Sequence, residues 1–228
     1  MDMPVQAVVA LLEDVVYPRG HYGQQACRAG AELLDKLLGV DVLDALNAYY
    51  VPGAEDLAVR AALEERFMEI DPRLVAKTAS VMSAHAARIA PYADAEEVFS
   101  MLHGMGVPLG LIVDGPPRSQ RQLVRHLKLE RIFRSMVFSG ELRGEQPWAD
   151  ALNLMELMLD CPLCCIALVC ARGGQAKLAS GRVGQVYRIF RHNPTGHRQS
   201  GNLTCSDIIP MLNLYDLPEA LGLVAWPD

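Results

Sequence analysis

The feature that most constrains the fold is an apolar run near the start of the chain, residues 7–20 (AVVALLEDVVYPRG). It passes into an acidic pair and stops at a proline and a glycine. A short apolar run that ends in turn residues is typical of a strand buried in a parallel sheet. Proteins of the α/β class place their chemistry in loops at the carboxyl ends of such strands. The acidic pair, Glu13 and Asp14, is therefore predicted to lie at such an end.

Helical patterns follow this strand for about 70 residues. Apolar residues recur at helical spacing in segments 24–39, 40–53, 55–70 and 71–91, and these segments are punctuated by glycine or proline. Gly39 is a helix stop signal, and the Asp71–Pro72 pair is a helix start signal. The pattern predicts about four helices of the length common in helical bundles.

The rest of the chain alternates between helix and strand patterns. Helices are predicted at 94–106, 119–133, 147–160 and 173–184, and strands at 107–115, 135–142, 164–170 and 185–191. Such alternation predicts a Rossmann-like parallel sheet of the α/β class. The helical bundle is then an insertion after the first strand, with a core domain over 1–18 and 93–228 and a cap over 19–92. The polar stretch 191–202, which contains His192 and His197, is predicted to be a loop.

Four segments resemble the sequence motifs of the haloacid dehalogenase-like (HAD) hydrolase superfamily, in its form with a helical cap. They are ALLEDVVYPRG at 10–20, LGLIVDG at 109–115, RGEQPWADAL at 143–152 and IALVCARGGQAKLASGRVGQVYRI at 166–189. The resemblance covers nearly the whole chain. It implies a Rossmann-like core with a cap inserted after the first strand.

The same resemblance implies that catalytic residues have been replaced. In this superfamily the first motif supplies an aspartate nucleophile that also binds Mg²⁺, and a second aspartate two residues later that acts as acid and base. Later motifs supply a hydroxyl group, a lysine and further metal-binding carboxylates. The matching positions here are Leu11 for the nucleophile, Glu13 for the acid/base group, Val113 for the hydroxyl, Gln146 for the lysine, and Ala171 and Ala176 for the metal ligands.

These replacements predict an apolar site without a metal or another cofactor, because an apolar floor cannot compensate for the dehydration of a divalent cation. Four residues remain candidates for binding a ligand: Glu13, Asp114, Gly115 and Arg172. Arg172 directly follows Ala171, and we expect its guanidinium group to bridge Glu13 or Asp114. In that arrangement an ion pair stands where the superfamily has its metal.

Two functions remain open at this point. The first is a pseudoenzyme that binds a ligand or a partner and has neither phosphatase nor dehalogenase activity. The second is a metal-independent hydrolase in which Glu13 and Asp114 act as acid and base. A cleft between cap and core would serve either function.

Charge narrows the range of partners. The chain carries 21 basic and 27 acidic residues, a net charge of −6, and this balance predicts neither a nucleic-acid partner nor a membrane partner. The sequence predicts a cytoplasmic protein. It leaves open a small-molecule ligand, a protein partner and a homodimer.

The cysteines are the remaining candidates for metal or redox chemistry. Cys161 and Cys164 have the spacing of half a zinc site, but no second pair follows. Cys164, Cys165 and Cys170 are predicted to be small apolar residues of a buried strand.

Overall fold

A parallel sheet of six strands forms the centre of the computed structural model, which describes residues 4–51, 53–66, 70–85, 89–115, 117–144, 146–191 and 208–223. The strand order is β3-β2-β1-β4-β5-β6. The strands are β1 (Ala7–Leu11), β2 (Leu109–Val113), β3 (Ser135–Phe138), β4 (Ile166–Cys170), β5 (Gln185–Ile189) and β6 (Ile208–Met211). The α/β class and the parallel sheet predicted from the sequence are confirmed.

The three central strands are apolar because both faces of the sheet are covered. Every residue of β1, β2 and β4 is buried. Strand β1 lies between the other two, with Val8 opposite Leu109 on one side and Ala167 on the other. The chain order reverses at β1, and open α/β sheets bind ligands at the carboxyl ends of strands where the order reverses.

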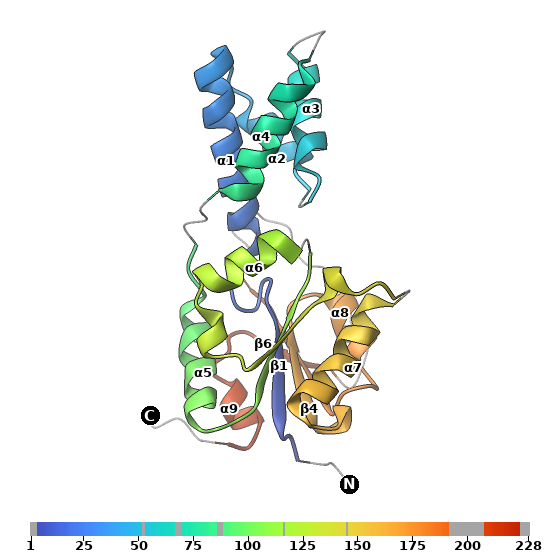
Figure 1. Cartoon of the computed structure of the whole chain (residues 1–228). Coiled ribbons are helices and arrows are strands. Elements are labelled where there is room, and N and C mark those ends of the chain that lie inside the picture. Colours follow the sequence, from blue (N-terminus) through green and yellow to red (C-terminus); the bar gives the residue numbers. More distant parts are fainter. Residues whose placement is uncertain are drawn as a thin grey trace.

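Helices cover both faces of the sheet (Figure 1). Helices α5 (Ala93–Gly104) and α9 (Leu217–Ala220) lie on one side, and α7 (Pro147–Leu159) and α8 (Gly173–Ala179) lie on the other. Helix α6 (Pro117–His126) lies near the carboxyl end of the sheet. This layering leaves the ends of the central strands facing the inserted helices.

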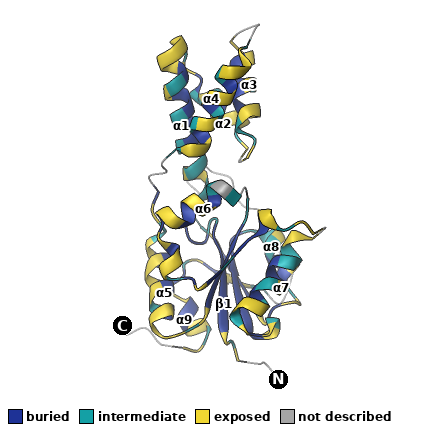
Figure 2. Cartoon of the chain, viewed as in Figure 1, coloured by how far each residue is buried: buried dark blue, intermediate teal, exposed yellow. Residues whose placement is uncertain are grey.

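The inserted segment consists of α1 (Arg19–Leu38), α2 (Leu43–Tyr49), α3 (Glu55–Glu64) and α4 (Pro72–Ala84). These helices share a hydrophobic cluster of their own, separate from the cluster around the sheet. Figure 2 shows buried residues on their inner faces and exposed residues outside. Gly30 allows α1 to pack closely on α4, because a Cβ atom there would lie 2.7 Å from Cγ of Met82.

The predicted signals at the ends of these helices are confirmed. Gly39 follows α1 with φ 66°, a left-handed conformation that glycine adopts without strain. Asp71 precedes α4, and its side chain accepts a hydrogen bond from the backbone N–H of Arg73.

Several predicted boundaries were wrong. The helix predicted over 119–133 ends at His126, because Lys128 adopts a left-handed φ of 56° and a short 3₁₀ turn follows. The strand predicted over 164–170 begins at Ile166, because a 3₁₀ turn after Pro162 occupies Leu163–Cys165. Cys164 is exposed as a result, whereas Cys165 and Cys170 are buried as predicted.

Strand β6 and helix α9 were not predicted from the sequence. Within the described ranges, no helix is long and apolar enough to span a membrane. His192 and His197, in the predicted loop, lie outside the described residues.

Candidate functional site

The loop after β1 turns sharply back on itself. Asp14 adopts a left-handed backbone conformation with φ 60°, which aspartate tolerates better than most residues. The backbone N–H of Asp14 donates a hydrogen bond of 2.8 Å to the carbonyl of Tyr17, and Glu13 forms a single β-bridge with the same residue. The turn fixes the Glu13 side chain at the carboxyl end of the strand.

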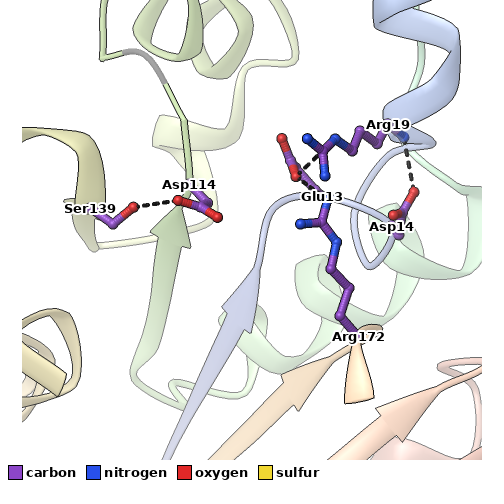
Figure 3. A network of polar contacts seen from close by, with 6 residues as sticks. All are labelled: Glu13, Asp14, Arg19, Asp114, Ser139 and Arg172. Carbon is purple, nitrogen blue, oxygen red and sulfur yellow. Dashed lines mark hydrogen bonds and ion pairs between the residues drawn. The ribbon is translucent and has the colours of Figure 1, made fainter. Parts of the chain in front are cut away.

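Two arginines converge on the Glu13 carboxyl group (Figure 3). Nη2 of Arg172 donates a hydrogen bond of 2.7 Å to Oε2, and Nε of Arg19 lies 3.5 Å from the same oxygen. The Glu13 side chain is only 10% exposed, against 30% for Arg172 and 40% for Arg19. The contact predicted for Arg172 is therefore present, with Glu13 rather than Asp114 as its partner.

Burial raises the pKa of the Glu13 carboxyl group to about 7. The charge of Arg19 opposes the rise, and the charges of Asp114 and Asp14 add to it. The hydrogen bond from Arg172 favours the ionised form, so loss of the proton strengthens that pair. Glu13 thus changes its charge near neutral pH.

Asp114 and Gly115 follow the neighbouring strand β2. Oδ1 of Asp114 accepts a hydrogen bond of 2.7 Å from the hydroxyl group of Ser139, at the end of β3. Gly115 has φ 108°, and a Cβ atom there would lie 3.1 Å from the amide nitrogen of Gln120. Glycine at this position leaves room for the Gln120 side chain.

The remaining motif positions carry no catalytic group. Leu11, Val113 and Ala171 are buried and apolar at the ends of β1, β2 and β4. Ala176 is buried in α8, and Gln146 is exposed just before α7.

The residues at these strand ends do not fit Mg²⁺. This ion needs oxygen ligands, and the positions that supply them in the HAD superfamily hold leucine and alanine here. Within the described part of the chain, no group of three or more histidine, cysteine, aspartate or glutamate residues could hold a metal ion.

A cleft of about 640 Å³ opens between this loop and the inserted helices. Its walls come from the β1 loop, from α1, α2 and α3, and from the start of α6. The side chains that line it include those of Glu13, Tyr22, Tyr50, Glu55 and Gln120. The cleft thus joins Glu13 to polar and aromatic side chains of the insertion.

Sequence reasoning did not identify Arg19, Ser139 or Gln120 as parts of this site. Arg19 carried a weak signal, because it directly follows the Pro18 that ends the first loop. Ser139 follows β3 as Asp114 follows β2, so its position at a strand end was readable once the strands were aligned. Gln120 carried no signal, because its burial depends on the packing of α6 against Gly115.

Solved structures with this architecture are numerous. An L-2-haloacid dehalogenase from Xanthobacter autotrophicus aligns with 97% of this chain and 100% of its own, at 18% identity and a TM-score of 0.65. A HAD family hydrolase from Deinococcus radiodurans, solved with bound phosphate and sodium, covers 98% and 99% of the two chains at 18% identity and a TM-score of 0.63. A 2-haloacid dehalogenase from Pseudomonas syringae covers 96% and 98% at 17% identity and a TM-score of 0.59.

The chain therefore has the fold of the HAD-superfamily hydrolases over nearly its full length, as the sequence motifs indicated. No protein-family model and no curated protein sequence matches it. At this level of identity the likeness defines the fold, and the activity has to be argued from the site.

Proposed function

We propose that this protein is a HAD-like pseudoenzyme, which has neither phosphatase nor dehalogenase activity and acts by binding a ligand or a partner. The observation that carries the proposal is the apolar end of β1, where Leu11 is 3% exposed. A leucine side chain has no lone pair with which to attack phosphorus or carbon or to bind a metal. Both chemistries of the superfamily need an aspartate at this position.

The pairing of Glu13 supports the same proposal. A carboxylate held by Arg172 at 2.7 Å is oriented toward that side chain and is less available as a base. In this account Glu13, Asp114, Gly115 and Arg172 form one wall of a binding site. Residues 19–92 act as a cap that supplies the opposite wall, and residues 1–18 and 93–228 act as the core.

We place the protein in the cytoplasm as part of this proposal. The described cysteines are free thiols, which is the usual state of cysteine in a reducing compartment.

One observation favours a second candidate, a metal-independent hydrolase. The pKa of Glu13 is raised to about 7, which is the range that suits a general acid or base at neutral pH. Asp114 is near enough to influence that pKa. In this alternative Glu13 and Asp114 transfer protons to and from an uncharged substrate, and a water molecule is the nucleophile.

A hydrolysis assay separates the two candidates. The purified chain is tested with an aryl phosphate, a panel of sugar phosphates, L-2-chloropropionate and an uncharged aryl ester, with and without Mg²⁺. The pseudoenzyme predicts no turnover above that of a buffer control, and the variant Leu11→Asp is expected to restore none, because the lysine and the other metal ligands are still missing. Turnover of roughly one per second or more that disappears in Glu13→Gln would overturn the proposal.

The control for that variant is Glu141→Gln. Glu141 is also paired with an arginine, Arg121, but the pair is exposed and lies outside the cleft. Loss of activity in Glu13→Gln alone would establish the second candidate, whereas equal activity retained in both variants would indicate a contaminating enzyme.

A further inference from the structure

The side chain of Gln120 is buried in the wall of the cleft with an unused hydrogen-bonding atom. Gln120 is 4% exposed, and its Oε1 atom is buried without a hydrogen-bond partner among the described residues. Buried polar atoms nearly always have a partner, and leaving one unpaired costs roughly 1–3 kcal/mol. A ligand group that reached this atom would recover that cost.

The backbone around Gln120 makes room for this amide group. Gly115 faces it, and a Cβ atom at that position would lie 3.1 Å from Nε2 and 3.6 Å from Cγ of Gln120. Gly115 also has a φ of 108°, which side-chain-bearing residues rarely adopt. The position of the amide is thus fixed by a residue that itself follows β2 at the candidate site.

The charged groups that line the cleft already have partners. Glu13 is paired with Arg172 and Arg19, and Asp14 accepts a hydrogen bond of 3.0 Å from the backbone N–H of Arg19. Glu55 accepts one of 3.0 Å from the backbone N–H of Gly53.

The same groups disfavour a charged ligand. Three carboxyl groups and one guanidinium group line the cleft, so an anion would meet net repulsion. A cation would have to compete with arginines and backbone N–H groups for carboxylates that are already bound. Of the buried side-chain atoms that lack a hydrogen-bond partner in the described part of the chain, the one that belongs to the cleft wall is the uncharged amide of Gln120.

Aromatic rings supply another part of the surface, beside the polar side chains of Gln24, Asn47 and Ser119. Tyr17, Tyr22 and Tyr50 line the cleft, and the ring of Tyr50 lies so close to Gly23 that a Cβ atom there would be 2.8 Å from Cε1. Tyrosine rings favour flat apolar or aromatic groups, which stack on their faces.

We propose that the cleft binds an uncharged ligand with a planar carboxamide group on an aromatic body, and that this carboxamide pairs with the side-chain amide of Gln120. The inference rests on the proposed binding function of the cleft. A carboxamide both donates and accepts a hydrogen bond, so it matches an amide side chain with either assignment of its oxygen and nitrogen. The aromatic body then lies against the tyrosines of the cap helices.

Three probes of almost identical shape test the charge and the pairing. Benzamide is neutral, benzoate is an anion and benzamidine is a cation. Each is titrated into the full-length chain at about pH 7, where Glu13 is half ionised, and binding is followed by NMR of the side-chain amide groups. The Gln120 signal is assigned by its absence in Gln120→Leu.

Benzamide is expected to bind most tightly and to shift the Gln120 amide signal. Gln120→Leu is expected to weaken benzamide binding by about tenfold, which is the effect of one lost hydrogen bond to a buried partner. The matched control is Gln122→Leu, because Gln122 is exposed on the same helix and does not line the cleft. This control is expected to leave binding unchanged.

Three results would overturn the inference: tighter binding of benzoate or benzamidine than of benzamide, no binding of benzamide at all, or binding that leaves the Gln120 signal unmoved. The ranking of the three probes uses the wild-type chain, so it holds even if a variant fails to fold. Tighter binding of a charged probe would leave the proposed binding function standing. Turnover in the hydrolysis assay would instead overturn the proposed function.

Discussion

Two buried carboxylate–arginine pairs hold the β1 loop, and they differ in how far each is enclosed. Asp94 in α5 pairs with Arg191 at 2.6 Å, and their side chains are 7% and 13% exposed. Glu13 pairs with Arg172 at 2.7 Å, with 10% and 30% exposed. The first pair is therefore the more enclosed, and the arginine of the second is the more open to solvent.

The partners of the Asp94–Arg191 pair indicate a structural role. Oδ2 of Asp94 also accepts a hydrogen bond of 2.8 Å from the backbone N–H of Leu214. Arg191 donates another of 2.8 Å to the carbonyl of Val15 and lies 4.0 Å from the ring of Tyr92. The pair therefore ties the β1 loop, α5 and the segment after β6 into one unit.

The Glu13–Arg172 pair is more exposed than the Asp94–Arg191 pair, and its charge changes with pH. Asp14 and Asp114 are close enough to raise the pKa of Glu13, and both Arg172 and Arg19 are more exposed than Glu13 itself. A carboxylate–arginine pair thus has a structural role at one place and contains a titrating group at the other. Variants that remove each pair in turn separate these two roles.

Removal of the enclosed pair is expected to cost the most stability. Asp94→Ala leaves the buried guanidinium group of Arg191 without its carboxylate, which typically costs about 3–5 kcal/mol. The free energy of unfolding, measured in urea, is expected to fall by this amount at every pH between about 5 and 8. Glu96→Ala, an exposed change in the same first turn of α5, is the control and is expected to cost less than about 0.5 kcal/mol. Equal effects of the two changes would contradict the structural role.

Glu13 is expected to make stability depend on pH. Its pKa rises from 4.5 to about 7 on folding, so the folded chain holds this proton more tightly than the unfolded chain. The resulting contribution is complete below about pH 4.5 and is lost as the pH rises through about 7, a difference of about 3 kcal/mol. Urea unfolding of the wild type and of Glu13→Gln over this range measures it, because the glutamine cannot titrate. Parallel curves for the two proteins would show that Glu13 has an ordinary pKa.

Loss of Arg172 is expected to have a smaller effect that also depends on pH. Arg172→Ala should cost about 1–3 kcal/mol at about pH 8, where the buried Glu13 carboxylate loses a partner. The cost should fall below about 1 kcal/mol at about pH 5, where Glu13 is protonated. Arg121→Ala removes the exposed partner of Glu141 and is expected to cost less than about 1 kcal/mol at both pH values. A cost for Arg172→Ala that is the same at both values would mean that Glu13 does not titrate between them.

Mg²⁺ is expected to have no effect on stability. The positions that hold this ion in the HAD superfamily are leucine and alanine here, and the remaining carboxyl groups of Glu13 and Asp114 are bonded to Arg172 and Ser139. The melting temperature should therefore be the same with Mg²⁺ and with a chelator. A saturable rise with Mg²⁺ concentration would reveal a metal site and contradict the account.

The fold and one contact of the site, that between Arg172 and Glu13, could be predicted from the sequence. Buried strands such as β1 and β4 are continuous apolar runs, which the sequence shows directly. Arg172 comes just after β4, so the predicted sheet was enough to place it near the end of β1. The edge strand β6 escaped detection because its four residues include a proline and two exposed positions. A short strand on the edge of a sheet has little apolar pattern.

The rest of the site depends on packing that sequence patterns do not encode. The burial of Gln120 follows from the contact of α6 with Gly115, and the raised pKa of Glu13 follows from burial beside two other acids. The exposure of Cys164 depends on a 3₁₀ turn that delays the start of β4 by two residues, a boundary error that apolar patterns cannot prevent.

The most direct test of the account is the titration of the Glu13 carboxyl group, followed by carboxyl-detected NMR in the presence and absence of Mg²⁺. The account predicts a pKa of about 7, raised by burial, that Mg²⁺ does not move, because Arg172 and Arg19 already bind the carboxylate and the described residues include no group of three that could hold a metal ion. A pKa near 4.5 would contradict the account by showing that Glu13 is ionised throughout the neutral range, and a pKa that falls when Mg²⁺ is added would show that this end of the sheet still binds a metal.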